Sequence, residues 1–161
     1  MKRIWWLPLA VLAVLASALL AQPSRSEAGS CTTLDRGVLP VWARTGFSDK
    51  QPKIAHVLGR HGRIVAILFG DLVAPATKDA GDKVLWAAKD PVKPLSDLKI
   101  SAQRVVNGRR VGKPVHRTVI GGPGPSGIEM PVPGCWRMSL KWSGRTDELD
   151  LRYRSSASKG A

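Results

Sequence analysis

The sequence has few of the residues from which enzyme and metal sites are usually built. Its 161 residues include two cysteines, three histidines and 12 acidic residues. Two cysteines are too few for a disulfide-dense mini-protein. The 16 glycines and 12 prolines follow no period, which excludes a collagen-like chain, and the sequence has no heptad pattern of a coiled coil. What the chain does have is basic charge and short apolar runs.

Basic residues outnumber acidic residues by 25 to 12, which gives a formal net charge of +13. With 43% hydrophobic and 23% charged residues, the composition is that of a globular protein and not of a disordered one. The length suits a single domain. The excess of positive charge makes nucleic acid, anionic lipid and acidic glycan the first partners to consider.

Residues 1–28 have the pattern of an export signal. Lys2 and Arg3 precede an apolar run over residues 4–21, and Ser26-Glu27-Ala28 places small residues where a signal peptidase requires them. Removal of this segment would take away three basic residues and one acidic residue and leave a net charge of +11. We therefore predict a protein that is secreted or associated with the cell envelope.

Two alternatives for this segment stay open. Cleavage could instead follow Ala18 or Ala21, and residues 4–21 are just long enough to serve as an uncleaved membrane anchor. Every one of these alternatives places the rest of the chain outside the cytoplasm. An exported location argues against nucleic acid as a partner, although the charge would suit it.

The two cysteines are predicted to form a disulfide. Cys31 and Cys135 would be oxidised to a pair in an exported protein. The alternative is that Cys31 carries a lipid, because Ala28-Gly29-Ser30 supplies small residues in front of it. Against that alternative, Cys31 lies ten positions after the end of the apolar run, and leucine is missing three positions before Cys31. The pattern favours the disulfide.

After residue 30 the sequence is typical of β-strands. Short alternating runs bounded by Gly, Pro and Asp replace any 3.6-residue period. Residues 63–69 are nearly all apolar, as in a central strand buried on both faces, and Asn107-Gly108 suits a tight hairpin turn. Residues 135–142 and 149–153 alternate most clearly. We predict an all-β antiparallel sandwich, immunoglobulin-like, with about 7–8 strands, and a barrel topology is the less favoured alternative.

The predicted domain organisation has four parts. The signal peptide, residues 1–28, is followed by an N-terminal segment, residues 29–56, that wraps the sandwich with Trp42 or Phe47 as an anchor. The β-sandwich domain covers residues 57–154, and a flexible tail covers residues 155–161. Within the sandwich, residues 128–132 are predicted to form a short edge strand because they contain a proline.

No catalytic residue, metal site or cofactor site is predicted. Ser126 lacks the spacing of a nucleophile elbow. His56, His61 and His116 lack the spacing of a zinc motif and are expected in surface or capping roles. The acidic cluster at residues 147–150 is predicted to form local ion pairs with the flanking Arg145 and Arg152 rather than a calcium loop.

A basic surface is the best candidate for binding. Basic residues are densest around the turn at Asn107-Gly108, and the predicted surface comprises Arg104, Arg109, Arg110, Lys113 and Arg117. Such a hairpin could meet an anionic cell-wall polymer, lipid head groups or an acidic protein. Three tryptophans lie at alternating positions of apolar strands, which predicts core packing rather than a sugar-stacking platform: Trp86, Trp136 and Trp142.

Residues 133–153 contain a Gly-Cys-Trp strand, a Trp-x-Gly turn and a Thr-Asp-x-Leu-x-Leu strand in this order. In these motifs the C-terminal region resembles a group of uncharacterised exported β-domain proteins and predicted lipoproteins of actinobacteria. The resemblance extends to residues 39–47, 64–70, 83–86 and 121–126. It implies export and a single β domain, and it supplies no catalytic residue.

The sequence therefore predicts an exported cell-envelope protein without enzymatic activity, acting as a binding or interaction module through its basic surface. A structural or accessory subunit of a membrane or envelope complex is the alternative, and a hydrolase is the third. An accessory subunit should expose an apolar patch. A hydrolase should have a pocket in which His, Asp or Ser side chains converge.

Overall fold

The computed structural model describes residues 31–77, 83–90 and 96–156, and the predicted signal peptide lies outside these ranges. The described residues form nine strands and one short 3-10 helix, η1 (Val41–Ala43), with no α-helix among them. In the same ranges no helix is long and apolar enough to cross a membrane.

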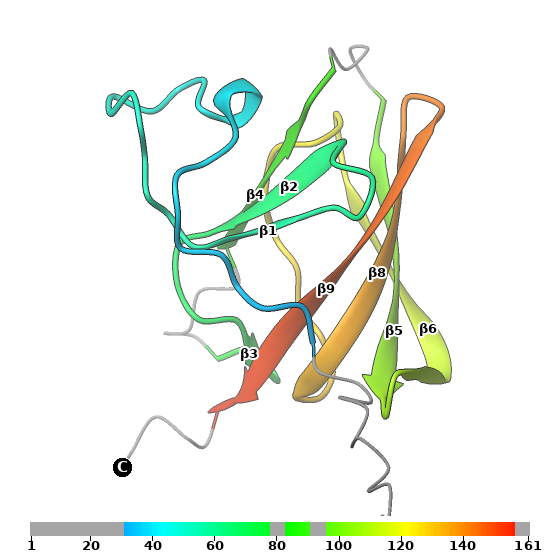
Figure 1. The fold of residues 1–161 in the computed structure, drawn as a ribbon. Coiled ribbons are helices and arrows are strands. Elements are labelled where there is room, and N and C mark those ends of the chain that lie inside the picture. Colours follow the sequence, from blue (N-terminus) through cyan, green and yellow to red (C-terminus); the bar gives the residue numbers. More distant parts are fainter. Residues whose placement is uncertain (1–30, 78–82, 91–95, 157–161) are drawn as a thin grey trace, which may run out of the picture.

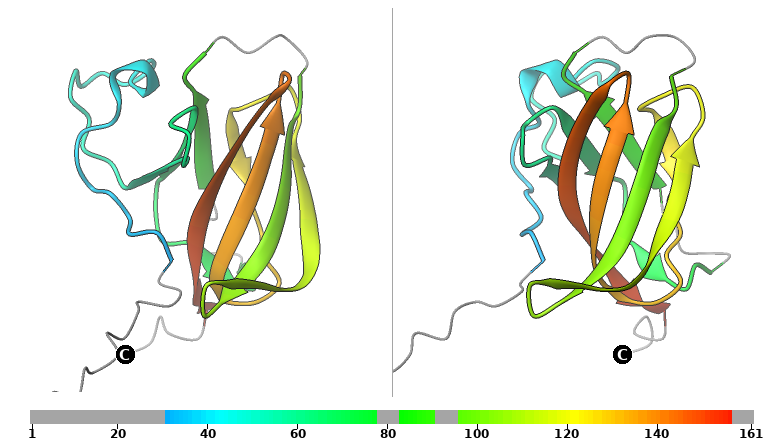
Figure 2. Two further views of the ribbon diagram at one scale, coloured as in Figure 1. Left: turned by 45° about the vertical axis from the view of Figure 1, so that its right-hand side comes forward. Right: turned by 90° about the vertical axis from the view of Figure 1, so that its right-hand side faces the viewer.

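The strands form two sheets that pack face to face (Figures 1 and 2). The four-stranded sheet is antiparallel and has the order β1 (His56–Leu58), β2 (Ile64–Leu68), β4 (Lys83–Ala88), β7 (Pro125–Gly127). The five-stranded sheet has the order β3 (Val73–Ala74), β9 (Arg145–Ser155), β8 (Gly134–Trp142), β5 (Leu98–Val106), β6 (Arg109–Val119). The predicted all-β sandwich is confirmed, and its kinship to immunoglobulin domains stays a prediction.

The core lies between the two sheets. Alternating residues of β5, β8 and β9 face inward, including Met138 and Leu140, and they meet Ile64, Ala66 and Leu68 of β2. The inward tryptophans are at most 3% exposed, which confirms their core packing: Trp86, Trp136 and Trp142. Burial of this apolar surface supplies the main driving force for folding.

Strand β2 is buried on both faces, as its apolar composition predicts. Its outward residues Val65 and Ile67 are covered by the chain that precedes β1. The covering side chains are Leu39, Trp42, Ala43, Phe47 and Ile54. This segment therefore closes the outer face of the four-stranded sheet and leaves the outer face of the five-stranded sheet uncovered by it (Figure 2).

Two tight turns set the register of the long hairpins. Asn107 and Gly108 have φ values of 49° and 74°, and Ser143 and Gly144 have φ values of 42° and 73°. Positive φ at both central residues matches the right-handed twist of the flanking strands. The Asn-Gly turn was predicted, and the Ser-Gly turn joins β8 to β9 in the same way.

The predicted strand over residues 128–132 is wrong. The strand in this region is β7, Pro125–Gly127, and residues 128–132 join no ladder. Ile128 and Met130 are nevertheless buried, at 1% and 2% exposure. The hydroxyl of Tyr153 donates a hydrogen bond to the carbonyl of Ile128 at 2.6 Å, so a side chain satisfies the backbone there instead of a neighbouring strand.

The predicted disulfide between Cys31 and Cys135 is confirmed, with a Cα–Cα distance of 5.4 Å. It ties the first described residue to β8, and both sulfur-bearing residues pack with Val105 of β5. A sulfur atom in this bond is not available for lipid attachment. The crosslink therefore holds the start of the covering segment against the five-stranded sheet.

Candidate binding surfaces

The five residues predicted as a binding surface all lie on the hairpin of β5 and β6: Arg104, Arg109, Arg110, Lys113 and Arg117. Arg104, Arg109 and Lys113 are exposed in the part of the hairpin nearest to its turn. Among the described residues, no ion pair joins any of these three to a carboxylate. Their charge is therefore directed to solvent.

The other two residues of the predicted surface are engaged within the protein. Arg110 reaches across the sheet and forms an ion pair with Glu148 of β9. The guanidinium of Arg117 donates hydrogen bonds to the backbone carbonyls of Glu129 at 3.1 Å and His116 at 2.9 Å. Arg110 therefore fastens the hairpin to the sheet, and Arg117 fastens it to the segment after β7.

An ion-pair network lies on the outer face of the five-stranded sheet, the face turned away from the core. Arg137 binds both carboxylate oxygens of Asp150, at 2.9 and 3.1 Å. These hydrogen bonds raise the pKa of Arg137 despite the opposing effect of its burial. Arg60 pairs with Glu148 at 2.7 Å, and Arg110 pairs with the same carboxylate. Both carboxylates are thereby neutralised.

The acidic residues 148 and 150 form ion pairs, as predicted, but the predicted partners Arg145 and Arg152 are wrong. Arg145 pairs instead with Asp90, and Arg152 forms no ion pair within the described ranges. The reason is the strand register, which places Arg137 of β8 directly opposite Asp150 of β9. Directly opposite side chains on one sheet face are closer together than residues two apart along one strand.

Asp147 has a structural role that differs from that of its neighbours. Its side chain is fully buried and accepts hydrogen bonds from the backbone N–H groups of His61, Arg63 and Glu148, at 2.9, 2.9 and 2.8 Å. Burial alone would raise the pKa of Asp147, but these three bonds and the nearby His61 ring lower it below the usual value. A Cβ on Gly59 would overlap this carboxylate. Asp147 therefore shapes the β1–β2 turn.

A groove of about 550 Å³ crosses the outer face of the five-stranded sheet. Lys99 of β5 lies directly opposite Lys141 of β8, and Thr118 and Thr146 extend the same row onto the neighbouring strands. The next row along the strands contains His116, Ser101, Ser139 and Glu148. The groove is therefore lined by cationic and hydroxyl-bearing side chains.

Four of the reactive side chains, Ser101, Ser139, His61 and His116, line the groove, whereas His56 and Ser126 lie outside it. His56 is buried, its ring hydrogen-bonded to a backbone carbonyl, whereas His116 is exposed. Ser126 accepts a hydrogen bond from the indole N–H of Trp86 at 3.0 Å, so its hydroxyl serves the core. The described ranges contain no group of three or more His, Cys, Asp or Glu residues that could hold a metal ion.

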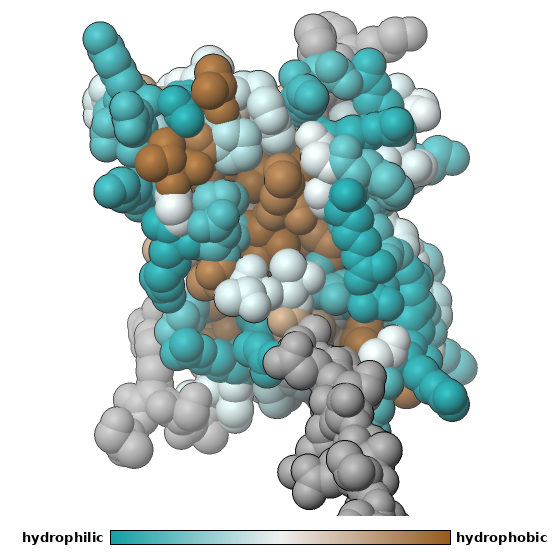
Figure 3. Space-filling view, in the orientation of Figure 1, coloured by the Kyte–Doolittle hydropathy of each residue, from teal (hydrophilic) through white to brown (hydrophobic). Residues whose placement is uncertain are grey.

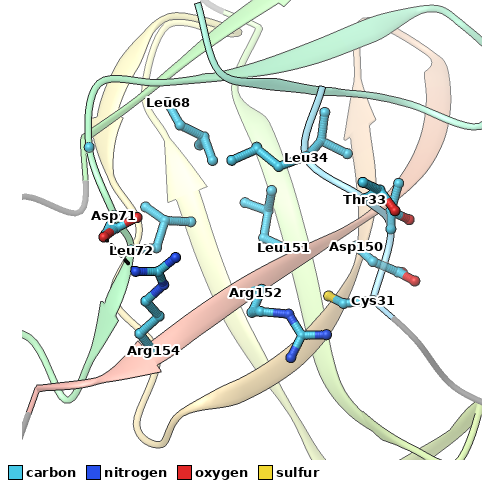
Figure 4. Close-up of a pocket in the computed structure, with 13 residues that line it drawn as sticks. Cys31, Thr33, Leu34, Leu68, Asp71, Leu72, Asp150, Leu151, Arg152 and Arg154 are labelled. Atoms are coloured by element: carbon cyan, nitrogen blue, oxygen red, sulfur yellow. Dashed lines mark hydrogen bonds and ion pairs between the residues drawn. The ribbon is translucent and has the colours of Figure 1, made fainter. Parts of the chain in front are cut away.

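An apolar cleft of about 370 Å³ opens between the edges of the two sheets. Figure 3 shows apolar surface at the centre of this face, with hydrophilic residues around it. The apolar lining residues include Leu34, Val57, Leu68, Leu72 and Leu151 (Figure 4). At the rim, Arg154 pairs with Asp71 at 3.0 Å, and Arg152 has no ion-pair partner within the described ranges.

Sequence reasoning identified the basic hairpin but missed the groove and the cleft. Lys99 and Lys141 are far apart in the sequence, and only the pairing of β5 with β8 brings them together. The alternation of both strands did place each lysine on a polar face, which was the available signal. The chain matches no protein-family model, no curated protein and no solved structure.

Proposed function

We propose that this protein is an exported, non-enzymatic binding module that holds an anionic cell-wall polymer through the basic hairpin of β5 and β6. One observation carries the proposal: Arg104, Arg109 and Lys113 are exposed together without a carboxylate partner within the described ranges. Arg110 and Arg137 of the same sheet are instead paired with Glu148 and Asp150. Three cations without such a pair therefore lie in the part of the hairpin nearest to its turn.

The hairpin is also held in place, which favours binding. The side-chain amide of Gln103 donates to the carbonyl of Gly112 at 2.7 Å, next to the bulge between Ala102 and Arg104. Arg110 anchors the same hairpin to β9. A surface that is already ordered loses less conformational entropy when a ligand binds.

The test replaces the three free cations. We expect the triple variant Arg104→Gln, Arg109→Gln, Lys113→Gln to bind a purified cell-wall fraction at least about fivefold more weakly, because each exposed charge contact contributes a few tenths of a kcal/mol or more. The matched control is Lys50→Gln, Lys53→Gln, Lys89→Gln, which removes the same charge from exposed positions elsewhere. Equal binding by both variants would show that the hairpin is not the binding surface.

The apolar cleft favours a second candidate, an accessory subunit of an envelope complex. A cleft of about 370 Å³ has the size and lining of a site for an apolar group. A subunit held by such contacts would remain attached to envelope fractions at high salt, where attraction between exposed charges is screened. A polymer-binding module would be released under the same conditions.

A further inference from the structure

The groove on the outer face of the five-stranded sheet contains an arrangement that costs free energy in the unliganded protein. Lys99 and Lys141 are directly opposite each other on neighbouring antiparallel strands. Like charges at directly opposite positions destabilise a sheet. Within the described ranges, neither ammonium group has a hydrogen-bond or ion-pair partner.

The acidic residues that line the groove cannot balance this charge. The carboxylate of Glu148 is already paired with Arg60 and Arg110. The carboxylate of Asp147 is turned into the protein, where three backbone N–H groups donate to it. Asp97 lines the adjoining pocket with both lysines, but it accepts a hydrogen bond from the backbone N–H of Gly121 and forms no ion pair with either lysine within the described ranges. The groove therefore keeps the charge of two ammonium groups.

Hydrogen-bond donors surround the lysines. Ser101, Thr118 and Thr146 present hydroxyl groups in the same two cross-strand rows, and His61 and His116 also line the groove. The hydroxyl of Ser139 is already engaged, since it donates to Glu148 and accepts from Arg110. Hydroxyl and ammonium donors arranged around one space can surround an oxyanion. The groove is open along the sheet and has a volume of about 550 Å³, so it can hold a phosphate together with the organic group that carries it.

The donor set distinguishes between oxyanions. A lysine binds either anion as a point charge, and the arginine fork suits both a carboxylate and a phosphate. The one arginine that lines the groove, Arg117, is already committed to two backbone carbonyls. Two lysines together with hydroxyl donors from several strands suit a phosphate, because its tetrahedral group presents acceptor oxygens on more sides than the planar carboxylate does.

We propose that the groove around Lys99 and Lys141 binds a phosphate group carried on a polyol or sugar, as in a phosphodiester-linked polymer. The aliphatic stems of the lysines and the threonine methyl groups would contact the carbon backbone next to the phosphate. This inference rests on the proposed function, since it names the charged group of the anionic ligand. It adds a site that does not include Arg104, Arg109 or Lys113 and lies farther from the turn of the same hairpin.

The test uses a soluble poly(glycerol phosphate), with polygalacturonate as a carboxylate polymer and phosphatidylglycerol vesicles as a lipid source of the same phosphate. We expect the wild-type protein to bind a phosphate probe in preference to polygalacturonate. The double variant Lys99→Gln, Lys141→Gln should bind it at least about tenfold more weakly. Whether the soluble polymer or the vesicle is bound identifies the source of the phosphate.

The matched control is Lys53→Gln, Lys89→Gln, which removes two exposed lysines from the rest of the surface. It should bind within about twofold of the wild type. Thermal unfolding of both variants checks that the fold is intact. A preference for polygalacturonate, or an unchanged affinity in Lys99→Gln, Lys141→Gln, would overturn the phosphate site.

The hairpin variant separates this proposal from the proposed function. If Arg104→Gln, Arg109→Gln, Lys113→Gln weakens wall binding but Lys99→Gln, Lys141→Gln leaves phosphate binding unchanged, the groove proposal is wrong and the module proposal stands. If Lys99→Gln, Lys141→Gln weakens binding and Arg104→Gln, Arg109→Gln, Lys113→Gln does not, the groove is the binding site and the three cations near the hairpin turn are not. If neither variant changes binding, both proposals are wrong.

Discussion

At the residue scale, Asp147 shows how one buried charge can be stabilised mainly by backbone groups, with a nearby imidazole beside them. Three N–H groups donate to its carboxylate, and the glycine at position 59 leaves room for it. The sequence pattern predicted that Asp147, Glu148 and Asp150 form local ion pairs with the flanking arginines. It could not separate them, because Asp147 faces inward and its three partners include two residues from a turn more than eighty positions earlier in the chain.

Replacement of Asp147 tests this arrangement. We expect Asp147→Asn to lower the free energy of unfolding by about 2–3 kcal/mol at neutral pH, because the amide NH₂ group would face a backbone donor. The pKa of Asp147 is lower in the folded protein than in the unfolded chain. The charged carboxylate therefore stabilises the fold fully at pH values above the usual carboxyl pKa, and this stabilisation is lost as the pH falls through the folded-state pKa. The difference in the free energy of unfolding between Asp147→Asn and the wild type should therefore become smaller in acid.

The measurement is urea unfolding of both proteins between about pH 3 and pH 7. Asp71→Asn serves as the control, since the Asp71–Arg154 pair is largely exposed and should contribute less than about 1 kcal/mol. A difference between Asp147→Asn and wild type that stays constant over this pH range would contradict the assigned role of the charge.

At the scale of elements, alternation and turn residues predicted most strands, but not how the strands meet. The pattern of β8 and β9 and the Asn107-Gly108 turn could be read directly from the sequence. The partners of Glu148 could not, because Arg60 and Arg110 come from a turn and a strand whose positions depend on the order of strands in the sheet. The groove lysines were missed for the same reason.

The covering segment depends on the disulfide at its start. Cys31 and Cys135 are 104 positions apart, and closing a loop of this length contributes about 4–5 kcal/mol in the chain-entropy model. We expect Cys31→Ser, Cys135→Ser to lower the urea midpoint of unfolding markedly. Adding a reductant should lower the midpoint of the wild type and leave the variant unchanged. An unaltered midpoint in the variant would mean that the crosslink does not stabilise the fold.

At the scale of the whole molecule, the net charge of +13 is unevenly distributed. Around β9 the carboxylates of Glu148 and Asp150 pair with Arg60, Arg110 and Arg137. Arg104, Arg109 and Lys113 of the hairpin and Lys99 and Lys141 of the groove have no such partners within the described ranges. We infer that these two areas of the five-stranded sheet provide the binding surface of the module. The covering segment occupies the opposite side of the sandwich.

The most direct test of this account measures binding of the purified protein to a cell-wall fraction at two salt concentrations. Raising the salt from about 0.05 M to about 0.5 M shortens the range of electrostatic attraction from more than 10 Å to less than 5 Å. The account predicts at least about a tenfold loss of affinity over this interval. Binding that does not change with salt would contradict recognition by the basic surface and would favour contacts through the apolar cleft.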